Sequence, residues 1–400
     1  MPFNLKKYLP QSIINRFWHL PKAMIANLVY GFPSKNIKVI GVTGTSGKTT
    51  TTHLIYHLLH QSKYSTALIS TISAQIGSQK IDIGLHVTNP DPFTLQKIIK
   101  KIKDQKFKYL VLEVTSHGLD QFRCWGIKFT YGVLLNLKHE HLDYHKTLQK
   151  YHQSKLKLIK SSAKPVLNSL DKNFNKAKSA VSKSIIQFQA PTEFSLPSTL
   201  IGSFNQENLA AAIAVVKDIG LTDQQIQKAL KSFPQIKGRM EIVKQKPFKV
   251  IIDFAHKPDA LKKALQAIGK MKAKSGRIIS VFGCAGLRDV EKRPMMGKIA
   301  SQLSDITILT AEDPRTEDVH QIISQIEAGF LKTKKNQLIK IPDRQKAINQ
   351  AVTLAKKGDI VVLFGKAHEK SLCFGKIELA WSEHQALIKA FKKVFKNQKK

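Results

Sequence analysis

The 400-residue chain has few acidic residues, few arginines and few cysteines. Its 28 aspartates and glutamates stand against 65 lysines and arginines, which gives a formal net charge of +37. The three cysteines, Cys124, Cys284 and Cys373, are spaced neither like a disulfide framework nor like a zinc site. We therefore expect a reducing compartment, the cytoplasm. No apolar run reaches the roughly 18–20 residues that a membrane span requires.

The longest apolar stretch, residues 17–32, is interrupted by Pro21 and Lys22 and carries no cleavage site. A signal peptide is not expected. A surface helix that packs on the body and a helix that lies on a membrane face both remain open, so peripheral membrane association of this segment is a possible partner interaction.

The basic excess raises the question of a nucleic-acid partner. The lysines are spread along the whole chain, and only eight of the 65 basic residues are arginine, the residue that most often reads bases. We expect no nucleic acid, and anionic small-molecule substrates fit the charge better. Six arginines fall inside or beside the motifs below, where a planar fork could grip carboxylate or phosphate: Arg123, Arg239, Arg288, Arg293, Arg315 and Arg344.

The hydrophobic pattern predicts an α/β protein with two doubly wound domains. Residues 1–36 form a short helical extension. Core strands at 37–42, 109–114 and 131–136 then alternate with helices and define a P-loop ATPase domain over residues 37–238, with a parallel-rich sheet. After a hinge near Gly238 the alternation restarts and predicts a smaller, Rossmann-like C-terminal domain over residues 239–400. Its strands are expected at residues 249–254, 277–282, 306–310 and 360–364.

A phosphate loop follows the first strand. Glycines allow its backbone N–H groups to surround phosphate oxygens, Lys48 can reach the terminal phosphates, and Thr49 can hold Mg²⁺. The spacing departs from the usual eight-residue pattern, because Val42 stands where glycine is normal. The expected nucleotide contacts are Gly44, Thr45, Ser46, Gly47, Lys48, Thr49 and Thr50.

Two further clusters carry chemistry. Glu113 ends a strand and can offer a hard oxygen ligand to Mg²⁺. Ser116, His117 and Arg123 follow it and are placed to bind an anionic substrate. Residues 136–145 read Asn-Leu-Lys-His-Glu-His-Leu-Asp-Tyr-His, and the sequence Tyr-His-Gln-Ser-Lys, which ends at Lys155, begins ten residues after His141. No cysteines accompany these histidines, so magnesium is favoured over zinc.

These motifs, in this order, resemble the Mur ligases over about residues 37–400. The similarity is greatest to the members that add 2,6-diaminopimelate to UDP-N-acetylmuramoyl-L-alanyl-D-glutamate in peptidoglycan synthesis. Folylpolyglutamate and cyanophycin synthetases are more distant relatives. The resemblance implies an ADP-forming ligase that uses ATP and two Mg²⁺ ions, activates an acceptor carboxylate as an acyl-phosphate and joins it to an amino acid.

The resemblance also implies roles for single residues. His141 would bind the second Mg²⁺ together with Lys155, which is carbamylated in the family. Asn208 would contact adenine, Arg239 the ATP phosphates and Asp253 the ribose. The catalytic set is therefore Lys48, Glu113, His141 and Lys155.

Substrate recognition is implied in the same way. Thr88 and Asn89 lie in a segment similar to the loop near the acceptor peptide, and join Ser116 and Arg123 as acceptor residues. In the C-terminal domain, two arginines can engage carboxylates and two acids can hold an ammonium. The expected amino-acid site is Arg288, Asp313, Arg315, Gly365 and Glu369. Departures from the family pattern are Glu140 for Asp, Asp313 for Asn and Ala367 for Gly.

About 36 residues precede the nucleotide strand, where the family normally carries a separate uridine-binding domain. We therefore expect that domain to be missing here. One alternative is a related ligase that acts on a non-uridine acceptor. Another is a P-loop ATPase without ligase activity, and a third is a nucleic-acid-associated ATPase. The head group of the acceptor, the choice between diaminopimelate and lysine, and the oligomeric state stay open.

Overall fold

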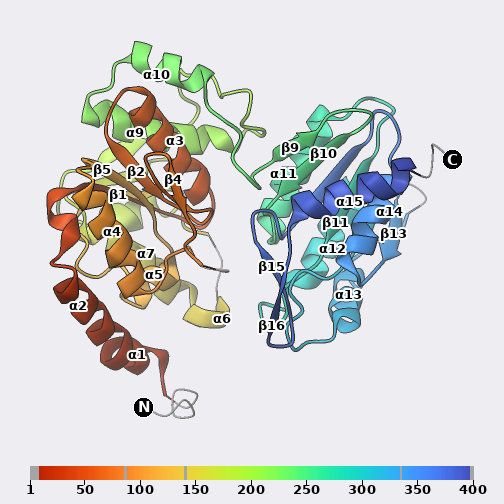
Figure 1. The fold of residues 1–400 in the computed structure, drawn as a ribbon, viewed down its shortest axis with the longest axis horizontal. Coiled ribbons are helices and arrows are strands. Elements are labelled where there is room, and N and C mark those ends of the chain that lie inside the picture. The colour runs from red at the N-terminus through yellow and green to blue at the C-terminus, as the bar shows by residue number, and fades with distance from the viewer. Residues whose placement is uncertain (1–8, 85–87, 139–141, 334–335, 397–400) are drawn as a thin grey trace. The chain divides into compact units, whose positions relative to one another are not determined.

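The computed structural model describes residues 9–84, 88–138, 142–333 and 336–396, and Figure 1 shows its ribbon. The chain divides into two compact units. The N-terminal unit consists of Met1–Pro197 and Asn205–Phe233, and the C-terminal unit consists of Ser198–Phe204 and Pro234–Lys400. Ser198–Phe204 thus belong to the C-terminal unit, although they precede the domain boundary at residue 238 that the sequence predicted.

The N-terminal unit is built on an eight-stranded sheet of order β4-β3-β2-β5-β1-β6-β7-β8. The strands from β2 to β8 in this order run parallel, and β3 and β4 add an antiparallel edge. The parallel-rich sheet predicted from the sequence is confirmed. Its strands are β1 (Lys38–Thr43), β2 (Thr66–Ile69), β3 (Ala74–Ile76), β4 (Gln79–Ile81), β5 (Tyr109–Glu113), β6 (Phe129–Leu134), β7 (Lys164–Asn168) and β8 (Ile186–Phe188).

Helices cover both faces of this sheet (Figure 1). On one face, Leu95 and Ile99 of α4 pack with Leu110 and Leu112 of β5 in a single apolar core. On the other, α3 lies against α9 and over the central strands. The helices are α1 (Gln11–Ile14), η2 (Asn15–His19), α2 (Leu20–Val29), η3 (Pro33–Asn36), α3 (Lys48–Gln61), α4 (Pro92–Asp104), α5 (Ser116–Asp120), α6 (Leu142–His145), α7 (Leu148–Ser161), α8 (Phe174–Lys178), α9 (Asn205–Ile219) and α10 (Asp223–Lys231).

The C-terminal unit has a six-stranded sheet of order β13-β12-β11-β14-β10-β9, in which only β9 is antiparallel. Its strands are β9 (Glu241–Lys244), β10 (Lys249–Asp253), β11 (Ile278–Phe282), β12 (Ile306–Leu309), β13 (Gln337–Lys340) and β14 (Ile360–Phe364). A separate hairpin is formed by β15 (Ser371–Phe374) and β16 (Ile377–Ala380).

Two apolar cores lie on the two faces of this second sheet. Alternate residues along each strand explain the split: Ile251 packs with α11, α12 and α13, whereas Val250 and Ile252 pack with α14 and α15. The unit is therefore doubly wound, as the sequence predicted. Its helices are α11 (Pro258–Met271), α12 (Lys292–Leu303), α13 (Val319–Glu327), α14 (Arg344–Leu354) and α15 (Glu383–Lys396).

The strand order decides where functional loops meet. In the N-terminal unit β5, β1 and β6 are neighbours, so the loops that follow them lie together at the carboxyl edge of the sheet. In the C-terminal unit the same holds for β12, β11 and β14. Within the described part of the chain, no helix is both long and apolar enough to cross a bilayer.

Candidate active site

The phosphate loop between β1 and α3 is held in shape by Asn136, at the end of β6. Its Oδ1 accepts hydrogen bonds from the backbone N–H groups of Thr45 (3.0 Å) and Ser46 (3.1 Å), and its Nδ2 donates to Ser46 O (3.3 Å). The Thr45 hydroxyl also contacts Tyr151 Oη at 3.0 Å. Because Asn136 engages the first two amides, the N–H groups at the start of α3 are the ones aimed at a phosphate.

Two lysines converge on one carbonyl of this loop. Lys155 Nζ donates to Gly44 O at 2.8 Å, and Lys48 Nζ donates to the same oxygen at 3.0 Å. Lys155 is only 1% exposed and lies over the ring of Tyr151. Burial, together with the positive charge of Lys48, holds the pKa of the Lys155 amine well below its usual range. The structure thus brings together a cation and an amine that burial drives toward its neutral form.

A hydroxyl and a carboxylate lie side by side at the start of α3. The Thr49 hydroxyl donates to Glu113 Oε1 at 3.0 Å, and Thr71 N donates to Glu113 Oε2 at 2.9 Å. Glu113 is 2% exposed. A threonine hydroxyl paired with a buried carboxylate is a donor set of hard oxygens, which fits Mg²⁺.

A further metal donor, His141, was expected nearby. It lies outside the described residues, as does Glu140. Among the residues that the structure does describe, no three His, Cys, Asp or Glu side chains gather into a metal-binding group. The oxygen pair at Thr49 and Glu113, with Lys155 across the loop, is therefore the part of the expected metal site that can be placed.

Asn208 of α9 packs directly against the phosphate loop. Gly47 has a φ of +86°, and a Cβ placed there would lie 2.1 Å from Asn208 Oδ1, so only glycine fits. The Asn208 side chain is buried, with Nδ2 donating to Asn205 Oδ1 at 2.9 Å. Thr50, next in the loop motif, is also buried.

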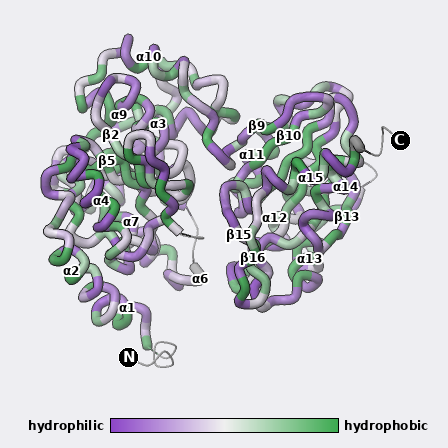
Figure 2. The backbone as a smooth tube through the Cα atoms, in the orientation of Figure 1, coloured by the Kyte–Doolittle hydropathy of each residue, from purple (hydrophilic) through white to green (hydrophobic). Residues whose placement is uncertain are grey.

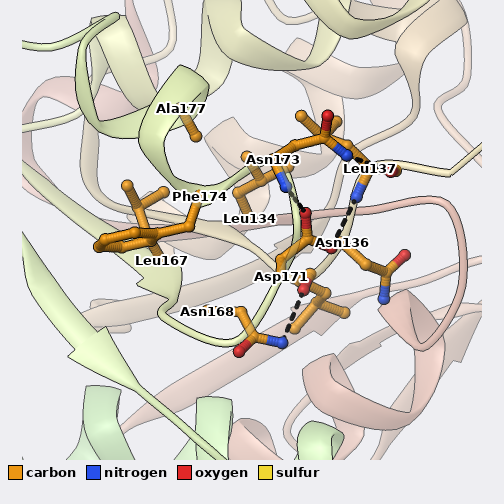
Figure 3. A pocket seen from close by; sticks show the side chains of 10 residues that line it. Leu134, Asn136, Leu137, Leu167, Asn168, Asp171, Asn173, Phe174 and Ala177 are labelled. Atoms are coloured by element: carbon orange, nitrogen blue, oxygen red, sulfur yellow. Dashed lines mark hydrogen bonds between the residues drawn. The ribbon is translucent and has the colours of Figure 1, made fainter.

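Beside Asn136 the N-terminal unit is hollowed. A small pocket of about 10 Å³, room for one water, lies between β6, β7 and α8. Figure 3 shows Asp171, Asn173 and Asn168 gathered around Asn136 and Leu137 there. An adjoining cavity of about 320 Å³ is of a size used for small ligands. It is lined by Asn136, Leu137, Lys138, Asn168, Leu170, Asp171, Lys172, Ala190 and Glu207.

The four expected acceptor residues come together beyond the end of β5. Asn89 is 1% exposed, donates to Glu113 O at 2.7 Å and accepts from Thr115 N at 2.8 Å. Arg123 Nη1 donates to Asn89 O at 2.6 Å, and the Thr88 hydroxyl bonds that of Thr71 at 2.9 Å. Ser116, which begins α5, is also buried. Asn89 is thus fully engaged in holding the loop.

In the C-terminal unit, Asp253 at the end of β10 closes the turn around Arg239. Its two carboxylate oxygens accept from Met240 N (2.8 Å) and Ala255 N (2.9 Å). Burial raises the pKa of Asp253, although Arg239 opposes the shift. The Arg239 guanidinium lies 4.8 Å from the centre of the Phe254 ring.

Four of the five amino-acid residues predicted from the sequence, Asp313, Arg315, Gly365 and Glu369, lie in the loops after β12 and β14, and Lys366 pairs with two of them. Its Nζ, which is completely buried, lies 2.8 Å from Asp313 Oδ1 and 2.5 Å from Glu369 Oε2. Sequence reasoning assigned both carboxylates to a substrate ammonium. The structure gives each of them a lysine partner.

The remaining members of the predicted set are Arg288, Arg315 and Gly365. Arg315 has a φ of +52° and donates from Nη1 to Gly286 O at 2.8 Å, whereas Arg288 is exposed. Gly365 has a φ of +97°, and a Cβ there would lie 2.5 Å from Glu312 Oε2. Burial raises the pKa of Glu312 to about 7 despite nearby lysines and an arginine.

Sequence reasoning missed three residues of these sites. Asn136 opened a recognised motif but received no role, although a polar residue at a strand end was a usable signal. Lys366 also sat inside a recognised motif. Glu312 precedes Asp313, and nothing in the sequence indicated that it is buried rather than exposed to solvent.

The comparisons with known proteins agree with this geometry. Residues 42–193 match the Mur ligase middle domain, and residues 238–367 match the Mur ligase glutamate ligase domain. A UDP-N-acetylmuramoyl-L-alanyl-D-glutamate--2,6-diaminopimelate ligase of Clostridium acetobutylicum is 34% identical over 97% of this chain and 86% of its own length. The ligase of that name in Aquifex aeolicus is 38% identical over 86% of this chain and 75% of its own.

Solved structures point the same way. A structure of a UDP-N-acetylmuramoyl-L-alanyl-D-glutamate--2,6-diaminopimelate ligase aligns with a TM-score of 0.61 and 26% identity, over 96% of this chain and 83% of that one. Escherichia coli FolC in complex with ADP shares the fold, with a TM-score of 0.71 at 17% identity over 95% of each chain. With two domains matched in order and curated relatives aligned over most of its length, this chain belongs to the Mur ligase family.

Proposed function

We propose that this protein adds 2,6-diaminopimelate to the glutamyl carboxylate of UDP-N-acetylmuramoyl-L-alanyl-D-glutamate at the expense of ATP. The chain is an ATP-dependent, ADP-forming amide ligase by family. The observation that carries the proposal is the convergence of Lys48 and Lys155 on Gly44 O, next to the Thr49–Glu113 pair. The names of the curated relatives support the choice of substrates.

The first step transfers the γ-phosphoryl group. The acceptor carboxylate attacks the γ-phosphorus, the bond to the β,γ-bridging oxygen breaks, and ADP leaves with that electron pair. Lys48 neutralises charge on the transferring group, and the N–H groups at the start of α3 hold phosphate oxygens. The product is an acyl-phosphate on the acceptor.

The second step makes the amide. The neutral amine of diaminopimelate adds to the acyl carbon, the tetrahedral adduct collapses, and phosphate leaves while the amine proton passes to solvent or to a base. Arg315 and Arg288 are proposed to hold the carboxylates of diaminopimelate. Because Asp313 and Glu369 already face Lys366, Glu312 adds a further carboxylate that can face an ammonium.

Magnesium belongs in this proposal as a cofactor. Thr49 and Glu113 would hold one ion, and His141 with carbamylated Lys155 would hold a second. Bound Mg²⁺ supplies positive charge that screens the phosphates from the incoming carboxylate. Lys155 suits carbamylation because CO₂ reacts with a neutral amine, and the nearby Lys48 can balance the resulting negative charge.

The test is ADP release measured over a matrix of acceptors and amino acids. We expect ADP only when the UDP-linked dipeptide and diaminopimelate are both present. Release that requires diaminopimelate but occurs with a non-uridine acceptor, and not with the UDP-linked dipeptide, would change the identity of the acceptor and leave the reaction type intact. Release that is independent of any amino acid would make the protein an ATPase and overturn the proposal.

A further inference from the structure

The N-terminal helical segment, residues 11–29, packs on its own unit through small and polar side chains and leaves its large apolar side chains exposed. The side chains that it buries are small or polar: Asn15, Ala23, Ala26 and Asn27. Asn15 Nδ2 donates to Asp120 Oδ2 at 2.7 Å, and Asn27 Nδ2 donates to Trp125 O at 2.8 Å. The buried side chains of the segment are therefore amides and alanines.

The opposite side of the same segment carries its large apolar side chains in solvent. Phe17 is 69% exposed, Leu28 is 67% exposed and Val29 is 63% exposed. Figure 2 shows hydrophobic residues along α1 and α2. The exposed apolar face comprises Ile13, Phe17, Trp18, Met24, Ile25, Leu28 and Val29. Large apolar side chains exposed together on one helical segment are typical of a binding face.

The neighbouring helix shows that this arrangement is not general in the unit. α2 packs against α4, and α4 buries Leu95, Ile99 and Ile102 while its lysines face solvent. The exposed residues Lys97, Lys100 and Lys101 place positive charge on the helix next to the apolar face. The N-terminal helical segment shows the opposite arrangement to α4, because its large apolar side chains face solvent.

The charge of the N-terminal residues indicates which kind of partner would bind the apolar face. The first acidic residue of the chain is Asp82, so residues 1–81 carry no negative side chain. The basic residues of the first 36 are Lys6, Lys7, Arg16, Lys22 and Lys35, of which Lys22 has its Nζ 3.6 Å from Asp91 Oδ1. With a net charge of +37 on each molecule, a second copy of this chain would be repelled, whereas a negatively charged surface would be attracted.

We propose that the N-terminal helical segment is a membrane-interface helix that lies in the headgroup region of an anionic lipid bilayer. Phe17, Trp18, Ile25 and Leu28 would enter the acyl boundary, and the flanking lysines would meet lipid phosphates. An apolar face with tryptophan and basic flanks is the composition of helices that lie on a bilayer without crossing it. The proposal does not depend on which substrates the ligase uses.

The test is flotation of the full-length protein with vesicles of phosphatidylcholine alone or of phosphatidylcholine with phosphatidylglycerol. Wild type should float with the anionic vesicles only, and less so as NaCl is raised. Replacing Phe17→Ser and Leu28→Ser together should lower the partition coefficient by at least about tenfold. The matched control is Ile377→Ser with Leu379→Ser, which removes exposed apolar side chains from the hairpin β15–β16 and should float like wild type.

Tryptophan emission gives a readout that needs no disruptive variant. Anionic vesicles with brominated acyl chains should quench wild type, and Trp18→Phe should lose most of that quenching. If wild type neither floats nor is quenched, the proposal is wrong. It is also wrong if the Phe17→Ser, Leu28→Ser variant stays folded by circular dichroism and floats like wild type, or if sedimentation shows that the apolar face instead joins two copies.

Discussion

Lys155 is an ordinary helical lysine in the sequence and an unusual one in the structure. It is 111 residues from Gly44 along the chain, yet its amine reaches the Gly44 carbonyl in a site that holds a second lysine. Two protonated amines on one buried carbonyl oxygen would repel each other, so burial and the charge of Lys48 lower the pKa of Lys155. A carbamate or a bound phosphate would relieve that repulsion, which is why the residue is a strong catalytic candidate.

Lys155→Ala should leave almost no ligase activity, and added bicarbonate should not restore it because no amine remains to carbamylate. The measurement is ADP release with saturating ATP, together with a carbamate signal in ¹³C NMR after labelling with ¹³C-bicarbonate. Wild type should show the signal and the variant should not. An active Lys155→Ala enzyme, or a wild type without any carbamate, would contradict the assignment.

Arg315→Ala should weaken the use of diaminopimelate more than that of lysine, since lysine has no second carboxylate for the guanidinium. Loss of one partner from a buried charged pair costs about 2–5 kcal/mol, which corresponds to at least roughly 30-fold in kcat/KM. The two amino acids are compared with the acceptor fixed. Arg277→Ala is the control, because Arg277 pairs with Asp359 away from this cluster. An equal loss for both amino acids would show that Arg315 does not read the distal carboxylate.

At the scale of elements, the sites depend on turns that connect parallel strands to helices. The phosphate loop keeps its shape because β6 lies beside β1 and brings Asn136 to the loop amides. In the C-terminal unit, Lys366 after β14 links the loop after β12 to its own loop. In both units a buried polar side chain from a neighbouring strand end sets the conformation of the functional loop.

Asn136→Ala should raise the KM for ATP, because the amides of Thr45 and Ser46 lose their buried acceptor and the loop can rearrange. Leaving such groups unsatisfied costs about 1–3 kcal/mol of stability. Asn27→Ala removes a buried asparagine of the N-terminal helical segment and should lower stability without changing the KM for ATP. If both variants bind ATP like wild type, Asn136 does not shape the phosphate site.

At the scale of the whole molecule, the net positive charge contrasts with buried ionisable groups whose pKa values are shifted. The excess of lysine gives the chain a formal net charge of +37, but burial shifts the pKa of several groups near the sites toward the neutral form. In the C-terminal unit, burial and then the charge of Arg239 lower the pKa of His368 to about 3. The Nδ1 atom of this histidine is buried and has no hydrogen-bond partner among the described residues.

His368 should therefore reduce stability in mild acid. A depressed histidine pKa means that the unfolded chain takes up a proton near pH 6.5 while the folded unit does not until about pH 3, so stability falls as pH drops through this window. Between pH 7 and pH 5 the loss should be about 2 kcal/mol. Urea unfolding of wild type and His368→Gln at both pH values measures it. Identical pH dependence in the two proteins would contradict the low pKa.

The sequence by itself determined the features that depend on neighbouring residues. A buried strand, a glycine-rich turn and a helix start are consecutive, so the phosphate loop could be recognised from residues 38–50. The order of strands and helices, and hence two doubly wound units, followed from periodicity for the same reason. Short strands such as β3, β4 and β8 were missed because three residues carry too little pattern.

Only the tertiary structure decided which distant side chains meet. That Lys155 shares a carbonyl with Lys48, and that Asp313 and Glu369 face Lys366, follows from strand order and loop conformation, which no local pattern encodes. The same is true of the N-terminal helical segment. Its composition predicted a helix, but which face it buries depends on the amide and carbonyl partners that the body presents to Asn15 and Asn27.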